Sequence, residues 1–313
     1  MPKTLPEPLT LVQSQEFIQA RYGNRAGRLT LLGAGAWSRA YAFTLEGAEA
    51  VVRFGAHGDD FLKDQIMAGY SSSTLPIPRV IELGQTPSGS FVVSERAHGA
   101  LLDDLDGAGV SEVLPSLIGA LDAMVNIDLT GAEGFGLWRP DATAPHSSWR
   151  EALLAVGSDT PGTRTHGWRA ALAASPTGDR PFDMAFEVLT RLSEQMPDQR
   201  HVIHSDLLHA NVLVDGSRLI AVLDWGNSLL GDHLYDAAWL LYWWPWYPAW
   251  SGIDIRAELV QHWSAHGGLP PDLDNRLRCY QIHIGLGAQA YNAFTGRLDH
   301  FGRQRETDSG TVR

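Results

Sequence analysis

Apolar residues in the first third of the chain fall in short runs separated by turn residues, which is the pattern of strands joined by tight turns. Two stretches, 9–22 and 59–70, show instead the spacing of apolar positions that is typical of helices. The segment 75–80 is expected to be extended, because each of its prolines keeps the preceding residue out of the helical region. The expected strands are 28–32, 38–45, 50–54 and 91–93, with a glycine turn over 33–37 between the first two.

From about residue 100 onward the helical period dominates. Apolar residues from Leu114 to Val125 recur at this period, and Ser111 is a suitable N-cap for their helix. Residues 131–181 follow neither period and receive no assignment. The other expected elements are helices over 182–196, 232–243, 254–266 and 272–295, and a β-hairpin over 212–223 that turns at Asp215-Gly216. The chain is therefore predicted to be an α+β protein with a small β-rich lobe, 1–96, and a larger, mainly helical lobe, 97–313.

The charge balance narrows the range of partners. The 313 residues include 24 Lys+Arg and 36 Asp+Glu, for a formal net charge of −12. This charge disfavours nucleic acid and an anionic membrane surface and favours a cationic small ligand. The single cysteine, Cys279, excludes a disulfide framework and a thiolate metal cluster. No signal-peptide pattern and no run of about 18 apolar residues occurs, so we expect a cytoplasmic protein. The sequence defines no oligomeric state.

One loop holds residues that suit phosphoryl transfer. The segment 204–211 contains Asp206 and Asn211 in the spacing H-x-D-x-x-x-x-N, and Asp224 follows the next predicted hairpin. Phosphoryl transfer needs a carboxylate that orients and deprotonates the attacking hydroxyl, and oxygen ligands for a Mg²⁺ ion that bridges the nucleotide phosphates. Asp206 is the candidate base. Asn211 and Asp224 are the candidate Mg²⁺ ligands, because Mg²⁺ prefers a few hard oxygen atoms.

These segments resemble the aminoglycoside phosphotransferase and choline kinase-like branch of the protein-kinase fold. The matching parts are the catalytic loop, the Asp224-Trp225 pair and the helix start Gly231–Ala238. The resemblance covers about residues 28 to 290 and implies a two-lobed kinase-like fold that uses ATP, or GTP, with Mg²⁺. One departure is His209, which stands where the family often has proline. A protein kinase is not expected, because the helix start follows the metal-binding aspartate too closely to leave room for a peptide-binding activation segment.

The resemblance also assigns positions around the nucleotide. Gly33, Gly35 and Ser38 stand where kinases have G-x-G-x-x-G, so the third glycine is missing, and a plain hairpin turn remains the alternative. The backbone carbonyl of Glu95 and the backbone N–H of Ala97 are the expected contacts for the adenine edge.

The lysine that kinases present to the nucleotide phosphates is missing. The chain has two lysines, Lys3 and Lys63, and Arg53 occupies the strand position expected for the phosphate-binding lysine. The carboxylate expected on the next helix is Asp64. Arginine bridges phosphate oxygens bidentately, and here a longer cation faces a shorter carboxylate, so an Arg53–Asp64 pair is a coherent replacement. The alternatives are that Arg53 is a solvated charge at the end of its strand, or that Lys63 binds the phosphates.

The resemblance implies that the acceptor is a small molecule with a hydroxyl group. Within the family, the segments Ser38–Ala40, Leu75–Pro78 and Trp244–Trp246 favour a cationic aminoglycoside such as hygromycin B. The aromatic run 239–250 belongs either to the core or to the acceptor site. Two other functions stay open: a kinase of a metabolite hydroxyl, of the choline, homoserine or sugar type, and a nucleotide-binding pseudoenzyme. Several carboxylates around the acceptor would favour an aminocyclitol, and an aromatic cage would favour a quaternary amine.

Overall fold

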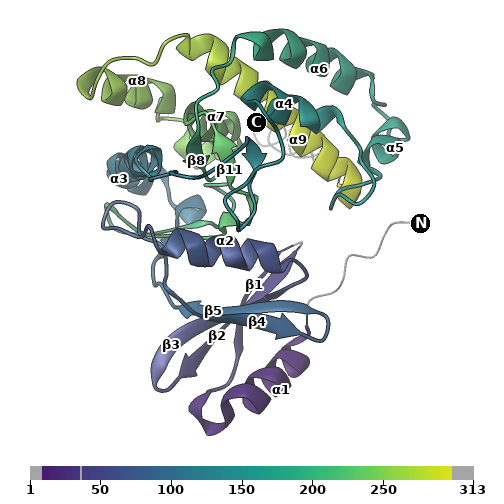
Figure 1. Ribbon diagram of the computed structural model, residues 1–313. Helices are drawn as coiled ribbons and strands as arrows, with labels where there is room; N and C mark the ends of the chain where they lie inside the picture. The colour runs from purple at the N-terminus through teal and green to yellow at the C-terminus, as the bar shows by residue number, and fades with distance from the viewer. Residues whose placement is uncertain (1–8, 36, 298–313) are drawn as a thin grey trace, which may run out of the picture.

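The computed structural model describes residues 9–35 and 37–297, and its N-terminal part is built on one antiparallel sheet (Figure 1). The five strands lie in the order β1-β2-β3-β5-β4. Arg53 pairs with Ala40 on one side and with Val92 on the other, so it lies on a central strand. The strands are β1 (Thr30–Ala34), β2 (Ser38–Leu45), β3 (Ala48–Gly55), β4 (Val80–Thr86) and β5 (Gly89–Glu95).

Two helices flank this sheet on opposite sides (Figure 1). Helix α1 (Leu11–Tyr22) begins at a capping box, in which the side chains of Thr10 and Gln13 each accept the backbone N–H of the other. Its buried residues pack with the strands in a small core. Helix α2 (Gly58–Ala68) lies between the sheet and the rest of the molecule, and its Met67 belongs to a second, larger core. Helix α2 therefore connects the two parts.

The elements expected in this part are confirmed, with two corrections. Strand β4 was not predicted, because its residues alternate poorly and most of them are only partly buried. The glycine turn is shorter than expected: Gly33 lies inside β1, and Gly35 donates its N–H to the Ser38 carbonyl at 2.9 Å. Ala36 of that turn lies outside the described residues.

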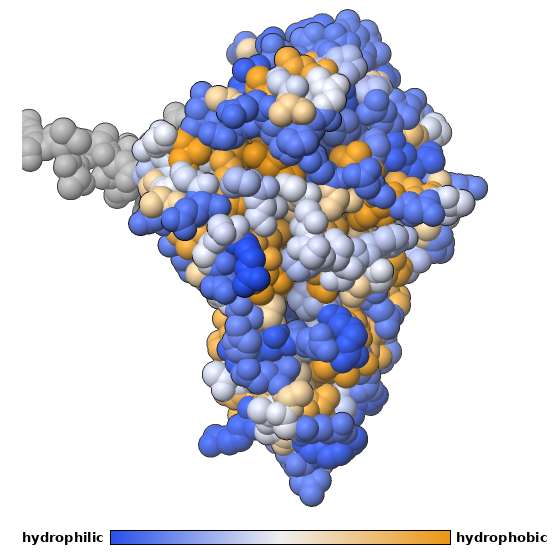
Figure 2. Space-filling model, turned by 90° about the vertical axis from the view of Figure 1, so that its left-hand side faces the viewer, coloured by the Kyte–Doolittle hydropathy of each residue, from blue (hydrophilic) through white to orange (hydrophobic). Residues whose placement is uncertain are grey.

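A link without regular structure, 96–99, leads from β5 into the larger part (Figure 1). Two small sheets in this part have the orders β10-β9-β6 and β7-β11-β8. Their strands are β6 (Ala100–Leu101), β7 (Gly136–Leu137), β8 (His201–Ile203), β9 (Val212–Asp215), β10 (Arg218–Val222) and β11 (Leu229–Gly231). The helices are α3 (Gly107–Val125), α4 (Trp149–Leu154), α5 (Trp168–Ala173), α6 (Arg180–Leu192), α7 (Leu234–Trp243), α8 (Ile255–Ala265) and α9 (Leu273–Thr295). In Figure 2 the molecule narrows toward the sheet-containing part at the bottom.

The predicted hairpin and the four predicted C-terminal helices are confirmed as β9–β10 and as α6 to α9. Ser111, however, is not an N-cap. Helix α3 begins one turn earlier, where Asp106 accepts the N–H of Gly109 at 2.9 Å. Ser111 lies inside the helix and donates its hydroxyl to the Gly107 carbonyl at 2.8 Å. The two glycines of this first turn have low helix propensity, so the sequence pattern did not indicate that helix α3 begins there.

Helix α3 is the one helix of residues 9–35 and 37–297 that is long and apolar enough to cross a membrane, judged by length and composition alone. Val110, Val113 and Leu117 place its apolar side in the larger core. Core helices of soluble proteins pass the same test.

The region 131–181, which had no assignment, contains β7 and the short helices α4 and α5. Its tryptophans Trp138, Trp149 and Trp168 are buried in the larger core. Trp149 packs so closely on Gly231 that a Cβ there would lie 2.4 Å from the indole ring. These elements form around large buried side chains and are too short to show a period in the sequence.

Candidate active site

The loop 204–211 joins β8 to β9 and is held in place by Asp236 at the start of α7. The two carboxylate oxygens of Asp236 accept the first two backbone N–H groups of the loop, each at 2.8 Å. The buried ring of His204 donates from Nε2 to the Leu223 carbonyl at 2.8 Å and accepts the N–H of Asp206 on Nδ1 at 3.2 Å. Burial lowers the pKa of His204 to about 4, so this ring is neutral and supports the loop.

Asp206 lies in this loop with 23% of its side chain exposed. One of its carboxylate oxygens is 3.0 Å from Nδ1 of His209. Burial raises the pKa of Asp206, and the hydrogen bond with His209 opposes that rise. A partly desolvated carboxylate that a substrate can still reach has the properties expected of a general base.

The two candidate Mg²⁺ ligands flank the hairpin β9–β10. Asn211 is buried, and its amide nitrogen donates to the Asp206 carbonyl at 2.8 Å, which leaves the amide oxygen as the atom suited to a cation. Asp224 adopts a φ of 60°, and its side chain is 46% exposed. Both offer the hard oxygen atoms that Mg²⁺ prefers, so the donor set fits this ion. Because the described residues contain no cluster of three or more His, Cys, Asp or Glu suited to a metal, phosphate or water oxygens would complete the shell.

Arg53 on β3 and Asp64 on α2 form an ion pair. Their side chains are 18% and 8% exposed, so Arg53 is not a solvated strand-end charge. Nη1 of Arg53 lies 3.8 Å from the carboxylate of Asp224. Burial works against the charge of Arg53, but the carboxylates of Asp64 and Asp224 outweigh burial and raise its pKa. The structure therefore brings the candidate phosphate-binding pair next to the candidate metal ligand.

Lys63 is adjacent to Asp64 in α2 but its amine points to a different partner. Its Nζ donates to the carbonyls of Gly226 and Ser228 at 2.7 and 3.2 Å. Asp64 accepts the N–H of Trp225 at 2.8 Å. Burial lowers the pKa of Lys63 to about 8. Helix α2 therefore binds the segment after Asp224 through three backbone atoms, those of Trp225, Gly226 and Ser228. The amine of Lys63 takes part in these contacts and does not lie at a phosphate site.

The glycine turn leaves space beside the sheet. A Cβ at Gly33 would meet no described atom within 4 Å, and one at Gly35 would approach only the Ser38 carbonyl, at 3.8 Å. The packing of the chain itself therefore does not require these two glycines. Strand β5 ends at Glu95, and Ala97 lies in the link 96–99 between the two parts, which is the place expected for a hinge.

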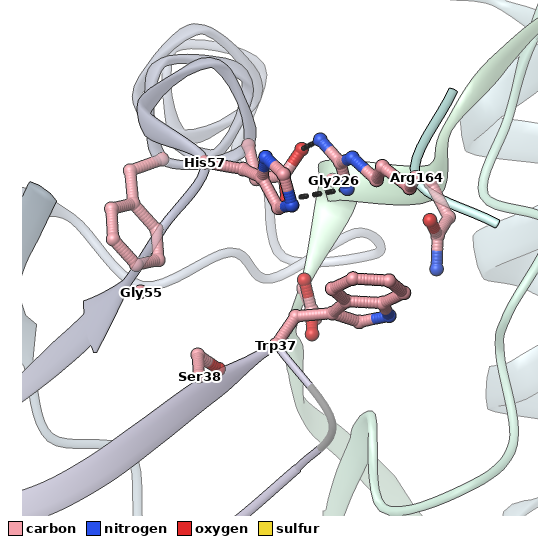
Figure 3. Close-up of a pocket in the computed structure, with 10 residues that line it drawn as sticks. Trp37, Ser38, Gly55, His57, Arg164 and Gly226 are labelled. Carbon is pink, nitrogen blue, oxygen red and sulfur yellow. Dashed lines mark hydrogen bonds and ion pairs between the residues drawn. The ribbon is translucent and has the colours of Figure 1, made fainter. Parts of the chain in front are cut away.

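A pocket lies where the sheet meets the helical part (Figure 3). Ser38 and Asp224 line it together with residues that the sequence did not mark as site residues. These are Trp37, Gly55, His57, Asp60, Phe61, Arg164, Gly226 and Asn227. Arg164 belongs to the region without assignment, and Asp60 is an ordinary acidic residue in a first helical turn, so no sequence signal singled them out.

Aromatic rings pack against His209, the hydrogen-bond partner of Asp206. The ring of His209 lies edge-on to Trp239 and Trp243, with ring centres 6.0 and 4.8 Å away. The indole nitrogens of both tryptophans are buried and have no hydrogen-bond partner among the described residues. Trp244 and Trp250 are buried members of the larger core, whereas Trp239 and Trp243 are partly buried and pack against it. The aromatic run is therefore divided between the core and the surroundings of the loop.

Asp103 also touches the catalytic loop. Its Oδ2 accepts the N–H of Ala210 at 3.0 Å and the hydroxyl of Tyr247 at 3.1 Å. Its Oδ1 is buried without a hydrogen-bond partner in the described part of the chain. This carboxylate, with one unused oxygen, was not found from the sequence, because the short 3-10 helix Leu102–Asp104 that carries it has no motif.

The fold and these side chains define a kinase-like phosphotransferase that acts on a hydroxyl group. The chain belongs to the phosphotransferase enzyme family APH, whose model matches residues 28–274. This confirms the resemblance seen in the sequence and the two-lobed fold that it implied.

Several known proteins are similar over nearly the whole chain. Hygromycin-B 4-O-kinase of Escherichia coli is 29% identical over 295 residues, which are 93% of this chain and 82% of the relative. The crystal structure of aminoglycoside phosphotransferase APH(4)-Ia gives a TM-score of 0.79 at 28% identity, over 93% of this chain and 94% of that chain. A thermostable mutant of the same enzyme, in a ternary complex with AMP-PNP and hygromycin B, gives 0.77 at 29% identity, over 91% and 92%. Spectinomycin phosphotransferase APH(9)-Ia, at 15% identity and a TM-score of 0.60, over 93% and 90%, shares the fold.

Proposed function

We propose that this protein transfers the γ-phosphoryl group of ATP to a hydroxyl of hygromycin B or a closely related aminocyclitol antibiotic. The observation that carries the proposal is the placement of four side chains: Asn211 donates to the Asp206 carbonyl within one braced loop, the charge of Asp224 contributes to the raised pKa of Asp206 after burial, and Nη1 of Arg53 lies 3.8 Å from Asp224. The similarity to hygromycin-B 4-O-kinase directs the choice of acceptor. GTP remains a second phosphate donor to test.

Each site residue has a separate role in the proposed phosphoryl transfer. Asp206 accepts the proton of the acceptor hydroxyl as its oxygen attacks the γ-phosphorus, and the bond from that phosphorus to the bridging oxygen of the diphosphate breaks. Arg53, held by Asp64, aligns the nucleotide phosphates. Asn211 and Asp224 would hold Mg²⁺, which neutralises phosphate charge when it is bound. The glycine turn 33–38 would cover the phosphates, and the backbone of Glu95 and Ala97 would bind the adenine edge.

The surroundings of Asp206 suit a polar cationic acceptor. Near the loop, Oδ1 of Asp103 and the indole N–H groups of Trp239 and Trp243 are buried and have no hydrogen-bond partner in the described residues, so a polar acceptor that reaches them would satisfy an acceptor atom and two donors. Two carboxylates, those of Asp103 and Asp206, lie at the catalytic loop, and acidic groups beside the attacking hydroxyl favour an aminocyclitol. The overall charge of −12 attracts a polycation from a distance.

The geometry argues against the pseudoenzyme. Its motivation is the missing lysine, and the Arg53–Asp64 ion pair occupies that position next to Asp224. An active enzyme of this kind would work in the cytoplasm, where ATP is available.

The deciding experiment is a nucleotide-turnover assay coupled to ADP release, run with ATP and with GTP across acceptors of different classes. We expect hygromycin B or a related aminocyclitol to give a far higher kcat/KM than choline, homoserine or a simple sugar. A higher kcat/KM with a metabolite alcohol would refute the antibiotic acceptor and keep the kinase. Tight nucleotide binding without turnover on any acceptor would support the pseudoenzyme.

A further inference from the structure

Arg164 crosses from the helical part of the molecule to the sheet-containing part. It lies in the loop between residues 157 and 168, and its side chain enters the pocket of Figure 3 from the helical side. Its Nη1 and Nη2 donate to the two carboxylate oxygens of Asp60 on α2, at 2.8 and 2.6 Å. The side chains are 28% and 16% exposed. A bidentate pair of this kind holds both the position and the plane of a guanidinium group.

Asp60 in turn packs on the chain that follows Asp224. A Cβ at Gly226 would lie 2.9 Å from the Cβ of Asp60, so the two backbones can approach only because residue 226 is glycine. The first turn of α2, the Asp224 loop and Arg164 therefore meet at one wall of the pocket. A bound nucleotide whose Mg²⁺ is held by Asp224 would place its terminal phosphates at this wall.

Trp37, at the end of the glycine turn, completes the arrangement. The Arg164 guanidinium lies 5.9 Å from the centre of its ring, and the same ring stacks on Phe294 of α9 at 6.2 Å and an angle of 10°. Figure 3 shows the indole lying across the pocket beneath Arg164. Arg164 thus lies beside Trp37 of the turn that would cover the phosphates, in a pocket that Asp224 also lines.

The charges of the pocket call for a cation at this point. Among the described residues that line the pocket, Arg164 is the one arginine or lysine, and it lies there with two carboxylates, Asp60 and Asp224. A nucleoside triphosphate adds several negative charges to these carboxylates, and the phosphate-binding lysine of other kinases is missing. The positive charge of Arg164 is felt inside the pocket, where it adds to burial in lowering the pKa of His57. Arginine forks match phosphate oxygens as well as carboxylates.

We propose that Arg164 is a second phosphate-binding cation, which contacts the γ-phosphate from the helical side while Asp60 keeps its guanidinium in place. The proposal rests on the proposed function, because it requires a nucleoside triphosphate in this pocket. Arg53 on the sheet and Arg164 on the helical part then hold the phosphates from opposite sides and close the two parts around them. Arg164 is a residue of the reaction itself, since it touches the group that is transferred.

The test compares equilibrium binding of ADP and AMP-PNP, each with Mg²⁺, by calorimetry in the wild type and in Arg164→Gln, Asp60→Asn and the double variant. Arg164→Gln should weaken AMP-PNP binding about tenfold more than ADP binding, since AMP-PNP alone carries the third phosphate. Asp60→Asn leaves Arg164 its charge but loosens its anchor, so the preference for AMP-PNP over ADP should fall about two- to threefold, less than in Arg164→Gln. Arg169→Gln is the matched control, because Arg169 is a nearby arginine paired with Asp183 outside the pocket.

Two results would overturn the role of Arg164. One is an equal loss of ADP and AMP-PNP binding in Arg164→Gln and Asp60→Asn, with no further loss in the double variant, which would make the pair a structural clasp alone. The other is unchanged binding in Arg164→Gln. If Arg164→Gln does not fold, as judged by thermal unfolding, Arg164→Lys replaces it, with the same selective loss expected in smaller degree. A wild type that binds neither nucleotide would refute the proposed function itself, and this outcome is distinct from both of the others.

Discussion

His209 places Nδ1 of its ring 3.0 Å from a carboxylate oxygen of Asp206, and it does so from a left-handed backbone conformation with φ of 64°. Residues other than glycine seldom adopt this conformation, so this position of the imidazole costs conformational free energy. The ring also lies edge-on to Trp243, at 4.8 Å between ring centres. This residue stands where related kinases often have proline, and it gives the candidate base a neighbour that orients it.

We predict that His209→Ala lowers kcat about tenfold and leaves the nucleotide KM nearly unchanged, because the hydrogen bond that orients Asp206 is lost while the phosphate site is intact. His209→Asn is the matched variant: asparagine tolerates a positive φ, and its amide can donate to the carboxylate, so much of the kcat should return. Steady-state kinetics with the preferred acceptor measure both. A His209→Ala enzyme with unchanged kcat would show that the contact has no part in turnover.

Substitutions of Asp206 and of Asp224 should have different effects, the first on turnover and the second on nucleotide binding. Asp206→Asn should lower turnover by about 10²–10⁴-fold with nearly intact affinity for Mg²⁺-nucleotide, because it removes the base and leaves the metal ligands. Asp224→Ala should weaken nucleotide binding itself, because it removes a metal ligand. Calorimetric binding and single-turnover rates separate the two. Near-normal turnover in Asp206→Asn would remove this residue from the mechanism.

Arg53 and Asp64 should behave as one unit. Arg53→Ala should raise the nucleotide KM and lower kcat, and Asp64→Ala should do the same more mildly, since it leaves the guanidinium charged but unanchored. The double variant should then lose less than the sum of the two free-energy changes. Additive losses would show that the two side chains act independently.

The exchange of residue types at this pair provides a sharper variant. Arg53→Lys should lose activity clearly, because a shorter ammonium group cannot reach the short Asp64 carboxylate and the phosphates together. Combining it with Asp64→Glu lengthens the carboxylate and should restore part of the loss. The readout is kcat/KM for the nucleotide, and a double variant no better than Arg53→Lys would contradict this explanation.

Lys63 should matter for stability more than its single charge implies. Lys63→Met removes the donor to the carbonyls of Gly226 and Ser228 and leaves them buried, at a cost of about 1–3 kcal/mol of unfolding free energy. Arg79→Ala is the matched control, because Arg79 is a cation whose side chain is 66% exposed and whose pair with Glu95 is exposed. Urea unfolding followed by tryptophan fluorescence measures both. Equal effects of the two substitutions would contradict the buried role of Lys63.

The same lysine predicts a pH dependence. Burial lowers its pKa in the folded protein to about 8, from 10.5 in the unfolded chain. Between these two values the unfolded chain binds more protons than the folded protein, so the stability of the wild type should rise with pH relative to Lys63→Met. The difference in unfolding free energy between the two proteins, measured from pH 7 to about 10, should therefore grow in favour of the wild type.

Cys279 offers a chemical test of the fold. It is fully buried in α9, and burial raises the pKa of its thiol to about 12. The thiolate is the form that reacts with alkylating reagents, so the native protein should resist iodoacetamide at pH 8, and the unfolded protein should react at once. Mass spectrometry counts the modification. Rapid labelling of the native protein would mean that α9 does not pack as described.

The catalytic loop and Arg53 show most clearly which site residues can be predicted from the sequence alone. Asp206, Asn211 and Asp224 could be found because their spacing is set by a short loop and a hairpin, which are local structures. Arg53 and Asp64 could be paired because the resemblance to kinases gives the strand position of the phosphate-binding cation and the position of its carboxylate on the next helix. The roles of these residues stay predictions, but the structure brings together the side chains that the sequence singled out.

The sequence could not predict the contacts of Arg164, of Asp103 or of Lys63. Each meets its partner across a large separation along the chain: Arg164 meets Asp60 from 104 residues away, and Lys63 meets Gly226 from 163. No periodicity or motif encodes such contacts, because they form only when α2 packs against the segment after Asp224 and the Trp-filled region 131–181 closes around the larger core. Local spacing therefore determined the catalytic loop, and the packing of distant segments decided which further charges face the pocket.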